Sequence, residues 1–265
     1  MYQRRFDMAN SLTGDVAGLA LAAGAGLRLR PLTLLRPKPL CPVGDRTLLD
    51  WALESLAAAG VDRAVNAHHQ VEQIQKHLDS LPGVTGEAVH LSIEREEALG
   101  TAGAVGALRP WLDGRGLLIV NADTFQRSDL SEFLGSWDGE RARILTATAL
   151  PFTPRSSVVA SLLPWRLASG LEPRPSGLWE LVWKQALAEG SLDAVYEPNP
   201  VIDCGTVRRY LQANLLWSSG ESVVGEDAEV LGSLTRSVVW PGSKVGPNEH
   251  LVDAVRAGSR TVLVR

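Results

Sequence analysis

A turn of small residues is the segment of this chain best suited to approach an anion. It follows an apolar run and comprises Ala22, Ala23, Gly24, Ala25 and Gly26. Small side chains leave backbone N–H groups accessible, and such groups at the end of a strand can hold a phosphate. Taken alone, however, such a turn favours an ordinary connection between a strand and a helix.

Two basic residues behind the turn favour phosphate binding. Arg28 follows the turn closely, and Lys38 stands between Pro37 and Pro39. Because the prolines favour an extended backbone and remove two N–H donors, we expect the lysine to sit on a stiff loop. An ammonium group held in this way suits a phosphate. The turn and the two cations together predict a polyphosphate site.

Two aspartates lie at the ends of predicted elements, where a carboxylate can bind a ligand or a metal ion. Asp123 comes just after the apolar run 116–120, and Asp203 comes just before a predicted helix. Asp123 can be a polar residue at the start of a loop, or, beside a phosphate, an oxygen ligand for Mg²⁺. Asp203 can be a carboxylate favoured by the helix dipole, or a functional group.

The apolar periodicity predicts strands that alternate with helices. The expected strands span residues 16–22, 63–67, 88–93, 116–120, 144–150, 158–163 and 192–196. The expected helices span residues 46–59, 71–78, 101–108, 130–137, 177–187 and 206–217, with Thr101 and Thr206 as N-caps. The pattern indicates an α/β fold with a doubly wound, mainly parallel, Rossmann-like sheet. Ligands of such sheets bind beyond the carboxyl ends of the strands.

The end of the chain has a different pattern. Residues 222–245 carry short apolar doublets separated by glycines, at steps of roughly six residues. This spacing predicts one or two coils of a short, left-handed β-helix-like tail. We therefore expect a disordered leader over 1–14, a main domain over 15–220 and the tail over 221–265.

Composition narrows the functional classes. The chain has 265 residues and a formal net charge of −4, which argues against a general nucleic-acid binder. No apolar run is long enough to span a membrane, and the start lacks the apolar stretch of a signal peptide. Cys41 and Cys204 have no Cys-x-x-Cys spacing, so we expect reduced, packed thiols in a cytoplasmic protein. No membrane partner is expected, and the sequence leaves open whether the chain forms a homo-oligomer.

The run AAGAGLRLRPLT…RPKPL is similar to the signature of the sugar-phosphate nucleotidyltransferases, or NDP-sugar pyrophosphorylases. One departure is Leu27, which stands where the family usually has a small hydroxyl residue. The resemblance implies a nucleotide-diphospho-sugar transferase type of Rossmann-like fold. It also implies that the substrates are a nucleoside triphosphate and a sugar 1-phosphate, and that the products are an NDP-sugar and pyrophosphate.

The resemblance also implies roles for the charged residues. Asp123 matches the aspartate of a short Asn/Gly-x-Asp element, and Asp203 that of an Asp-x-Gly-Thr element. These two aspartates would hold Mg²⁺. We further expect Arg28, with the amides of Gly24 to Gly26, to hold the β and γ phosphates, and Lys38 to sit against the α phosphate. Val201 departs from the aromatic residue that relatives often have there.

Residues 94–103 look like the family's Leu-Gly-Thr-Ala segment, which lines the base and ribose. Gly100 would let the backbone approach a planar base, and Thr101 would cap the helix beneath it. Glu94, Glu96 and Glu97 are expected to be solvated charges. The alternative is that one of them, assigned to Glu94, accepts hydrogen bonds from guanine.

The residues that would bind the sugar phosphate are harder to identify in the sequence than those that would bind the nucleotide. The family usually has a Glu-Lys-Pro element whose lysine binds the sugar's phosphate, and residues 144–158 contain no such element. Arg155 or Lys184 could replace that lysine, and Asn121 is also assigned to the substrate. Because Leu99–Gly103 and the β-helix-like tail are similar to the guanylyltransferase branch of the family, the resemblance implies a GTP-binding transferase that acts on mannose 1-phosphate or a related sugar or cyclitol phosphate. Alternatives are a thymidylyl- or uridylyltransferase acting on glucose 1-phosphate, and a non-catalytic regulatory subunit that binds nucleotide sugars.

Overall fold

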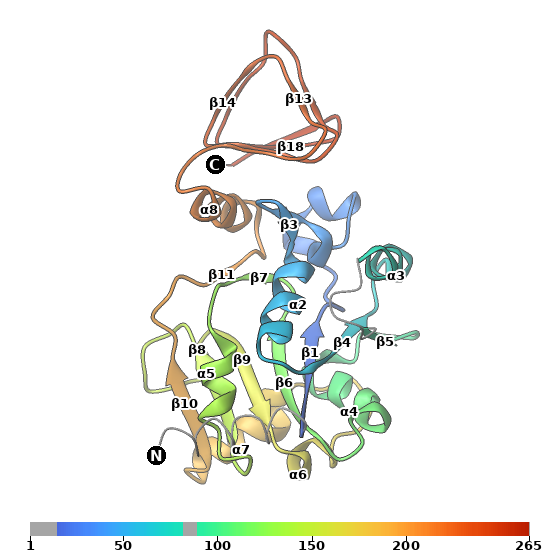
Figure 1. Ribbon diagram of the computed structural model, residues 1–265, viewed down its shortest axis with the longest axis vertical. Helices are drawn as coiled ribbons and strands as arrows, with labels where there is room; N and C mark the ends of the chain where they lie inside the picture. Colours follow the sequence, from blue (N-terminus) through green and yellow to red (C-terminus); the bar gives the residue numbers. More distant parts are fainter. Residues whose placement is uncertain (1–14, 82–88, 265) are drawn as a thin grey trace. The chain divides into compact units, whose positions relative to one another are not determined.

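The computed structural model of the chain describes residues 15–81 and 89–264 (Figure 1). The described residues fall into two compact units. The first unit lies within Met1–Gly24, Ala52–Ala122 and Gln126–Val201, and the second within Ala25–Trp51, Asp123–Phe125 and Ile202–Arg265. This division differs from the expected boundary at residue 220, which stays a prediction. The predicted leader, 1–14, lies outside the described residues.

A seven-stranded sheet forms the centre of the first unit. Its strands are β1 (Val16–Leu21), β4 (Asp62–Ala67), β5 (His90–Ile93), β6 (Gly116–Asn121), β8 (Ala142–Thr146), β9 (Val158–Leu163) and β10 (Leu192–Tyr196). Their order is β10-β8-β9-β6-β1-β4-β5. Only β9 runs antiparallel to its neighbours. The expected α/β fold with a mainly parallel sheet is therefore confirmed.

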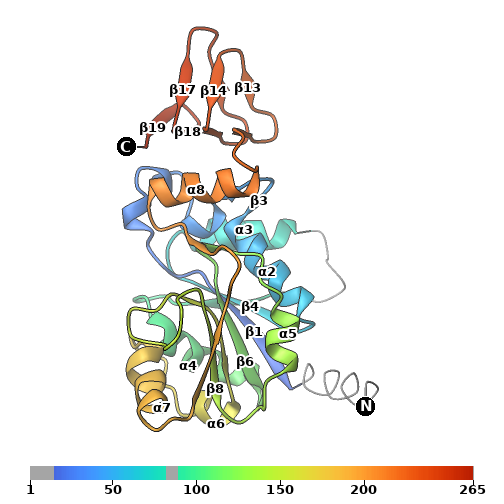
Figure 2. The same ribbon diagram turned by 90° about the vertical axis from the view of Figure 1, so that its left-hand side faces the viewer.

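Helices cover both faces of this sheet. They are α3 (Val71–Ser80), α4 (Gly100–Leu112), α5 (Leu130–Gly135), α6 (Trp165–Ala168) and α7 (Lys184–Ala188), and α2 (Leu48–Ala58) enters this unit at residue 52. Figure 2 shows α4 and α7 on one face and α5 on the other. The central strands are buried on both faces, which explains why their sequences are continuously apolar.

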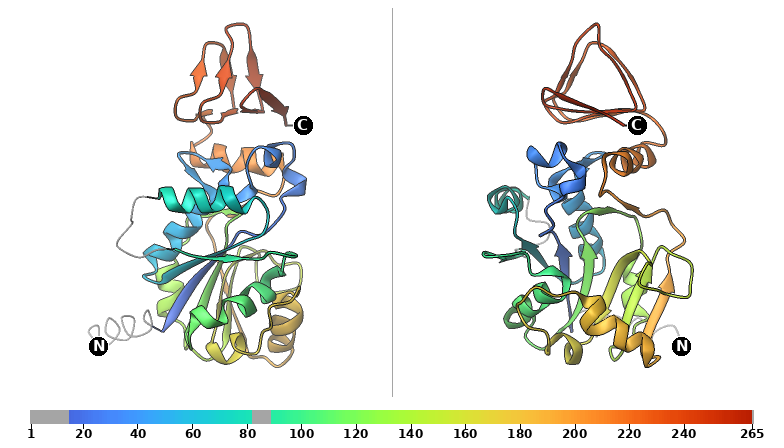
Figure 3. Two further views of the ribbon diagram at one scale, coloured as in Figure 1. Left: turned by 90° about the vertical axis from the view of Figure 1, so that its right-hand side faces the viewer. Right: turned by 180° about the vertical axis from the view of Figure 1, so that it is seen from behind.

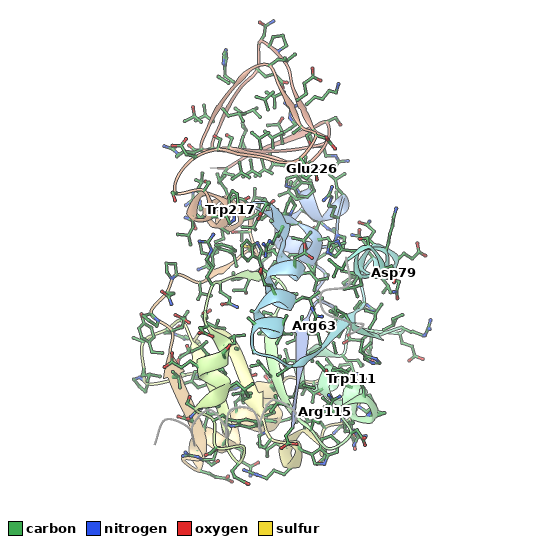
Figure 4. All side chains as sticks on the ribbon, viewed as in Figure 1. Arg63, Asp79, Trp111, Arg115, Trp217 and Glu226 are labelled. Atoms are coloured by element: carbon green, nitrogen blue, oxygen red, sulfur yellow. The ribbon has the colours of Figure 1, made fainter. Side chains whose placement is uncertain are left out.

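Several predicted bounds need correction. The helix expected over 101–108 runs from Gly100 to Leu112, with Pro110 inside it. Arg115 follows this helix, and its guanidinium lies 4.8 Å from the centre of the Trp111 ring (both labelled in Figure 4). The strand expected over 144–150 is β8, which ends at Thr146. The helix expected over 177–187 is a π-helical turn, Trp179–Trp183, followed by α7.

The second unit begins with three 3-10 turns, at Leu27–Leu29, Leu32–Leu34 and Lys38–Leu40. A short hairpin of β2 (Pro42–Val43) and β3 (Arg46–Thr47) follows, so the helix expected from residue 46 begins only at Leu48. Further along the chain, β7 (Thr124–Phe125) pairs with β11 (Ile202–Asp203). Helix α8 (Val207–Trp217) is capped by Thr206, as predicted.

Short strands complete the second unit. They are β12 (Val223–Val224), β13 (Glu229–Val230), β14 (Ser233–Thr235), β15 (Val238–Val239), β16 (Lys244–Val245), β17 (His250–Val252), β18 (Ala254–Ala257) and β19 (Arg260–Leu263). Strands β12, β15 and β18 pair in parallel, as do β13 with β16 and β14 with β17. The segment traces a triangle in Figure 1, and the left view of Figure 3 shows its successive turns side by side. Its assignment as a left-handed β-helix stays a prediction.

Candidate functional site

A two-strand ladder brings Asp123 and Asp203 together in the second unit. Asp203 of β11 pairs with Thr124 of β7, and the Cys204 N–H donates to the Asp123 carbonyl at 3.0 Å. The two aspartates are far apart in the sequence, and this ladder is what makes them neighbours.

The Lys38 ammonium lies between the two carboxylates. It donates to Asp123 Oδ2 at 2.7 Å and to Asp203 Oδ1 at 3.2 Å. The Lys38 residue is only 5% exposed, whereas the aspartate side chains are 42% and 35% exposed. Arg209 adds a second cation, with Nη1 at 3.6 Å from Asp203 Oδ2. The cluster of Lys38, Asp123 and Asp203 is therefore a buried cation that holds two accessible carboxylates.

The backbone at Lys38 differs from the expected extended path. Pro37 is extended, but Lys38 begins a 3-10 turn, and the Cys41 N–H donates to the Lys38 carbonyl at 3.0 Å. The fixed φ of Pro39 suits the first turn of a helix, so the second proline favours this turn. Lys38 is therefore held by a 3-10 turn and two ion pairs, and not by an extended segment.

Gly26 supports the same cluster from the small-residue turn. Its φ is +61°, and a side chain there would lie 2.9 Å from Thr33 Cγ2 and 3.0 Å from Lys38 Cβ. The Thr33 hydroxyl donates to the Gly26 carbonyl. Within the described part of the second unit, no acceptor pairs with the N–H of Ala25 or Gly26. Of the turn, only Ala25 and Gly26 belong to the second unit.

Arg28 is exposed and lies beside the aspartate cluster. A Cβ on Gly205 would lie 2.9 Å from Arg28 Nη2 and 3.0 Å from Asp203 Oδ1. Any side chain at position 205 would therefore meet both the guanidinium and the carboxylate, so glycine leaves room for them. All four residues expected to be catalytic, Arg28, Lys38, Asp123 and Asp203, are gathered in the second unit.

The donor set of this cluster suits a hard divalent cation. Among the described residues no group of three or more His, Cys, Asp or Glu side chains could hold a metal ion alone. Two accessible carboxylates fit Mg²⁺, because that ion is usually bound by one or two carboxylates together with substrate phosphates.

A chain of hydrogen bonds organises the other predicted nucleotide residues, which lie in the first unit. The Ala22 N–H donates to Asn66 Oδ1 at 2.8 Å, and Asn66 Nδ2 donates to Glu94 Oε1 at 2.7 Å. The Leu99 N–H donates to Glu94 Oε2 at 2.7 Å. This relay links β1, β4, β5 and the start of α4. The amide of Ala22 is thus already paired, in contrast to the accessible amides expected across the turn.

Glu94 is therefore a buried structural acceptor, and the expectation of a solvated charge at this position is wrong. It is 3% exposed, whereas Glu96 and Glu97 are exposed as expected. Asn66, the other partner in the relay, was not singled out by the sequence analysis. An asparagine near the end of a buried strand is the signal that could have found it, because a buried amide needs partners.

Thr101 does not cap α4 as predicted. The helix begins at Gly100, and the Thr101 hydroxyl instead accepts the Leu178 N–H at 2.8 Å. The Ala102 N–H donates to the Ser176 carbonyl, and the Ser176 N–H donates to the Leu99 carbonyl. Residues 176–178 therefore supply hydrogen-bond partners to the first turn of the helix, at the Ala102 N–H and the Thr101 hydroxyl.

The three residues assigned to the sugar come from three different segments of the first unit. Asn121 ends β6, and its Nδ2 donates to the Val158 carbonyl at 3.2 Å. Arg155 is exposed in the loop 147–157 between β8 and β9, which the Ala147–Ser157 hydrogen bond closes. Lys184 is exposed on α7.

Cys41 and Cys204 are buried free thiols of the second unit, in agreement with the expected packed thiols. Burial raises the pKa of each to about 12. Within residues 15–81 and 89–264, no helix has the length and apolarity needed to cross a membrane.

Comparison with known proteins gives a family match. The Nucleotidyl transferase family model matches residues 17–156 of this chain. This range contains the small-residue turn, Lys38, Glu94 and Asp123, and ends before Asp203.

The similar curated proteins carry related names. A protein of Oryza sativa subsp. japonica named Probable mannose-1-phosphate guanylyltransferase 1 is 27% identical, over 87% of this chain and 74% of that protein. The mannose-1-phosphate guanyltransferase of Pichia angusta is 34% identical, over 51% of this chain and 38% of its own. The N-acetylmuramate alpha-1-phosphate uridylyltransferase of Caulobacter vibrioides is 34% identical, over 46% of this chain and 53% of its own. The matches thus span about four-tenths to three-quarters of these relatives.

Solved structures share the fold. A Bacillus anthracis protein assigned as a glucose-1-phosphate thymidylyltransferase superimposes with a TM-score of 0.63 at 20% identity, covering 76% of this chain and 94% of its own. The UDP-glucose pyrophosphorylase of Acinetobacter baumannii gives a TM-score of 0.59 at 17% identity, covering 76% and 92%.

Proposed function

Because the chain belongs to the nucleotidyl transferase family, we propose that it transfers a nucleotidyl group from a nucleoside triphosphate to a sugar 1-phosphate. In this reaction an oxygen of the sugar phosphate attacks the α-phosphorus. The bond from that phosphorus to the bridging oxygen breaks, and pyrophosphate leaves. The protein's contribution to such a transfer is chiefly positioning and neutralisation of charge.

The observation that supports this proposal most strongly is the cluster of Lys38, Asp123 and Asp203. A buried ammonium at 2.7 and 3.2 Å from two accessible carboxylates is suited to a charged, metal-bound substrate. We assign two roles to Lys38: it holds both carboxylates in place, and it supplies a positive charge to the α phosphate. Arg28 and the amides of Gly24 to Gly26 bind the β and γ phosphates.

Asp123 and Asp203 would hold Mg²⁺ in this proposal. When bound, the ion would neutralise phosphate charge that the protein's own cations leave unpaired. The accessible carboxylates fit that task because substrate phosphates can complete the coordination.

The nucleoside side of the proposal rests on the first unit. The relay from Ala22 through Asn66 and Glu94 fixes the backbone before Gly100, and we propose that this backbone, with Gly100 and Thr101, lines the base and ribose. Glu94 is here a positioning residue, because both of its oxygens already accept hydrogen bonds. GTP is the proposed nucleotide, since the relatives from Oryza sativa and Pichia angusta carry guanylyltransferase names.

Mannose 1-phosphate, or a related sugar or cyclitol phosphate, is the proposed acceptor. The loop between β8 and β9 lacks a Glu-Lys-Pro element, so Arg155 or Lys184 replaces its lysine, and Asn121 contacts the sugar. We also propose a cytoplasmic location and a reduced left-handed β-helix for the tail.

Two other candidate functions have specific support. A uridylyltransferase fits the name of the Caulobacter vibrioides relative, and a thymidylyltransferase is kept beside it as the alternative from the sequence. A non-catalytic nucleotide-sugar-binding subunit fits the absence of the Glu-Lys-Pro element and the presence of Leu27.

Pyrophosphate release tests the three candidates. The purified protein is given GTP, UTP, dTTP or CTP, each with Mg²⁺ and with mannose 1-phosphate, glucose 1-phosphate or a cyclitol phosphate. We expect release to be fastest with GTP and mannose 1-phosphate, with one NDP-sugar formed per pyrophosphate. Release confined to UTP or dTTP with glucose 1-phosphate would favour the second candidate. If no substrate pair released pyrophosphate, but the nucleotides still raised the melting temperature, the non-catalytic binding subunit would be favoured.

A further inference from the structure

The first unit contains a cavity of about 210 Å³ at one edge of its sheet. Leu21 and Asn121, at the carboxyl ends of β1 and β6, line it together with Val158 at the start of β9. A water molecule occupies about 30 Å³ in the liquid, so this volume accommodates several waters or one small ring. Ligands of open α/β sheets bind at this edge.

Trp183 lines this cavity and has an unsatisfied donor. Its indole Nε1 is buried, and no residue of the described chain accepts its hydrogen. A buried donor without a partner costs about 1–3 kcal/mol, so its persistence calls for an explanation. The ring also packs edge-on against Phe152, with centroids 6.5 Å apart.

A π-helical turn explains why Trp183 reaches the cavity. The turn spans Trp179–Trp183, and its i→i+5 pattern places residues five apart on one side. Leu178 and Trp183 are five residues apart, and both line the cavity. Turns of this kind are frequent at functional sites. The Thr101 hydroxyl fixes the start of the segment by accepting the Leu178 N–H.

The chemistry of the lining selects for an uncharged ligand. The polar side chains are those of Thr101, Asn121, Ser161 and Trp183, and none of the lining residues is Lys, Arg, His, Asp or Glu. The remaining walls are aliphatic. A ring with several hydroxyl groups suits amide and hydroxyl partners on polar walls and C–H contacts on the others. A carboxylate in this cavity would be buried without a counter-charge, which is costly.

We propose that this cavity takes the uncharged, polyhydroxylated ring of the phosphate acceptor, and that Trp183 donates its indole N–H to one ring hydroxyl. This inference rests on the proposed function and goes beyond it in naming a specificity residue and excluding acidic sugars. Sugar 1-phosphates with a carboxylate, such as N-acetylmuramate 1-phosphate, are predicted to be poor substrates even though a relative carries that name.

The kinetic test compares two tryptophans of the same π-helical turn. Trp183→Phe keeps an aromatic ring but removes the donor, and Trp179→Phe is the matched control because Trp179 also packs on Phe152 without lining the cavity. We expect Trp183→Phe to lower kcat/KM for the sugar phosphate about tenfold, the size of one lost hydrogen bond, with KM for the nucleotide unchanged. An analogue of the sugar phosphate that lacks the hydroxyl bound by Trp183 should have a lower kcat/KM than the parent compound with the wild type. With Trp183→Phe, the analogue and the parent compound should have the same kcat/KM. Equal kinetics of Trp183→Phe and wild type would overturn the proposal.

A binding readout separates failure of this inference from failure of the proposed function. In protein labelled with ¹⁵N at tryptophan indoles, the Trp183 N–H signal is identified by its loss in Trp183→Phe. We expect that signal to shift when mannose or mannose 1-phosphate is added, whether or not the protein has turnover. Turnover with an unmoved Trp183 signal would overturn the inference alone. A moved signal without turnover on any substrate pair would overturn the transferase activity and keep the cavity assignment.

Discussion

At the scale of single residues, the arrangement around Lys38 explains how two carboxylates remain together. Asp123 and Asp203 repel each other, and the buried ammonium between them offsets this repulsion. Arg209 at 3.6 Å offsets part of the remaining negative charge on Asp203. A lysine that is almost fully buried is rarely tolerated unless it is paired, and the two ion pairs supply that condition.

Replacement of Lys38 is expected to abolish most turnover without unfolding the chain. Lys38→Met keeps the apolar stem and removes the charge, and loss of one such preorganised group typically costs about 10²- to 10³-fold in kcat. Lys76→Met, at an exposed position on α3, is the control. Pyrophosphate release measures the effect, with circular dichroism to verify folding. Turnover of Lys38→Met within threefold of wild type would contradict the role assigned to the ammonium.

Replacement of Glu94 is expected to act on the nucleotide's KM. Glu94→Gln places an amide NH₂ against one of two donors, Asn66 Nδ2 or the Leu99 N–H, and so breaks the relay. We expect KM for the nucleotide to rise roughly tenfold, as for one lost hydrogen bond, and KM for the sugar phosphate to change little. Glu96→Gln, at an exposed position, is the matched control. If both variants gave the wild-type KM, the relay would not position the nucleoside side.

At the scale of elements, the sequence predicts regular structure better than short pairings. The sheet, most helices and the Thr206 cap follow from apolar periodicity and capping chemistry. The ladder between β7 and β11 has only two residues per strand, too few to leave a periodic signal. The apolar pattern of 177–187 cannot distinguish an α-helix from a π-helical turn. Asp123 and Asp203 were therefore expected to be functional from their motifs, but the ladder that pairs them was not predicted.

Helix α8 is anchored by a buried tyrosine whose loss should be measurable. The Tyr210 hydroxyl donates to the Pro42 carbonyl and accepts the Trp240 indole N–H at 2.9 Å. Tyr210→Phe leaves buried partners unsatisfied and is expected to lower the free energy of unfolding by about 1–3 kcal/mol in urea titrations. Tyr196→Phe, at a residue 47% exposed, should change it little. An unchanged Tyr210→Phe midpoint would mean that the hydrogen bonds add nothing to stability.

At the scale of the whole molecule, three buried groups make stability sensitive to alkaline pH. Burial raises the pKa of Cys41 and of Cys204 to about 12, and raises the pKa of Tyr210 well above its usual value of 10. In the unfolded chain these groups lose protons at lower pH than in the folded chain. Their contribution to stability is therefore complete below about pH 9 and is lost as the pH rises toward 12.

Thermal unfolding as a function of pH tests this expectation. The melting temperature should fall steadily between pH 9 and pH 11, and the fall should be shallower in the Cys41→Ala/Cys204→Ala double variant, which lacks both thiols. A melting temperature that stays level over this range, or a double variant with the wild-type slope, would show that thiol ionisation is not linked to unfolding.

The measurement that tests the central claim most directly is the affinity for Mn²⁺. It is determined by electron paramagnetic resonance in the presence of a non-reacting GTP analogue. Mn²⁺ is a spectroscopic substitute for Mg²⁺, so the signal reports on the ion that Asp123 and Asp203 are proposed to hold. We predict that Asp123→Asn/Asp203→Asn raises the Kd for Mn²⁺ at least tenfold, whereas Asp227→Asn, at an exposed position in the tail, leaves it unchanged. Equal Mn²⁺ affinity in the double variant and the wild type would contradict the account.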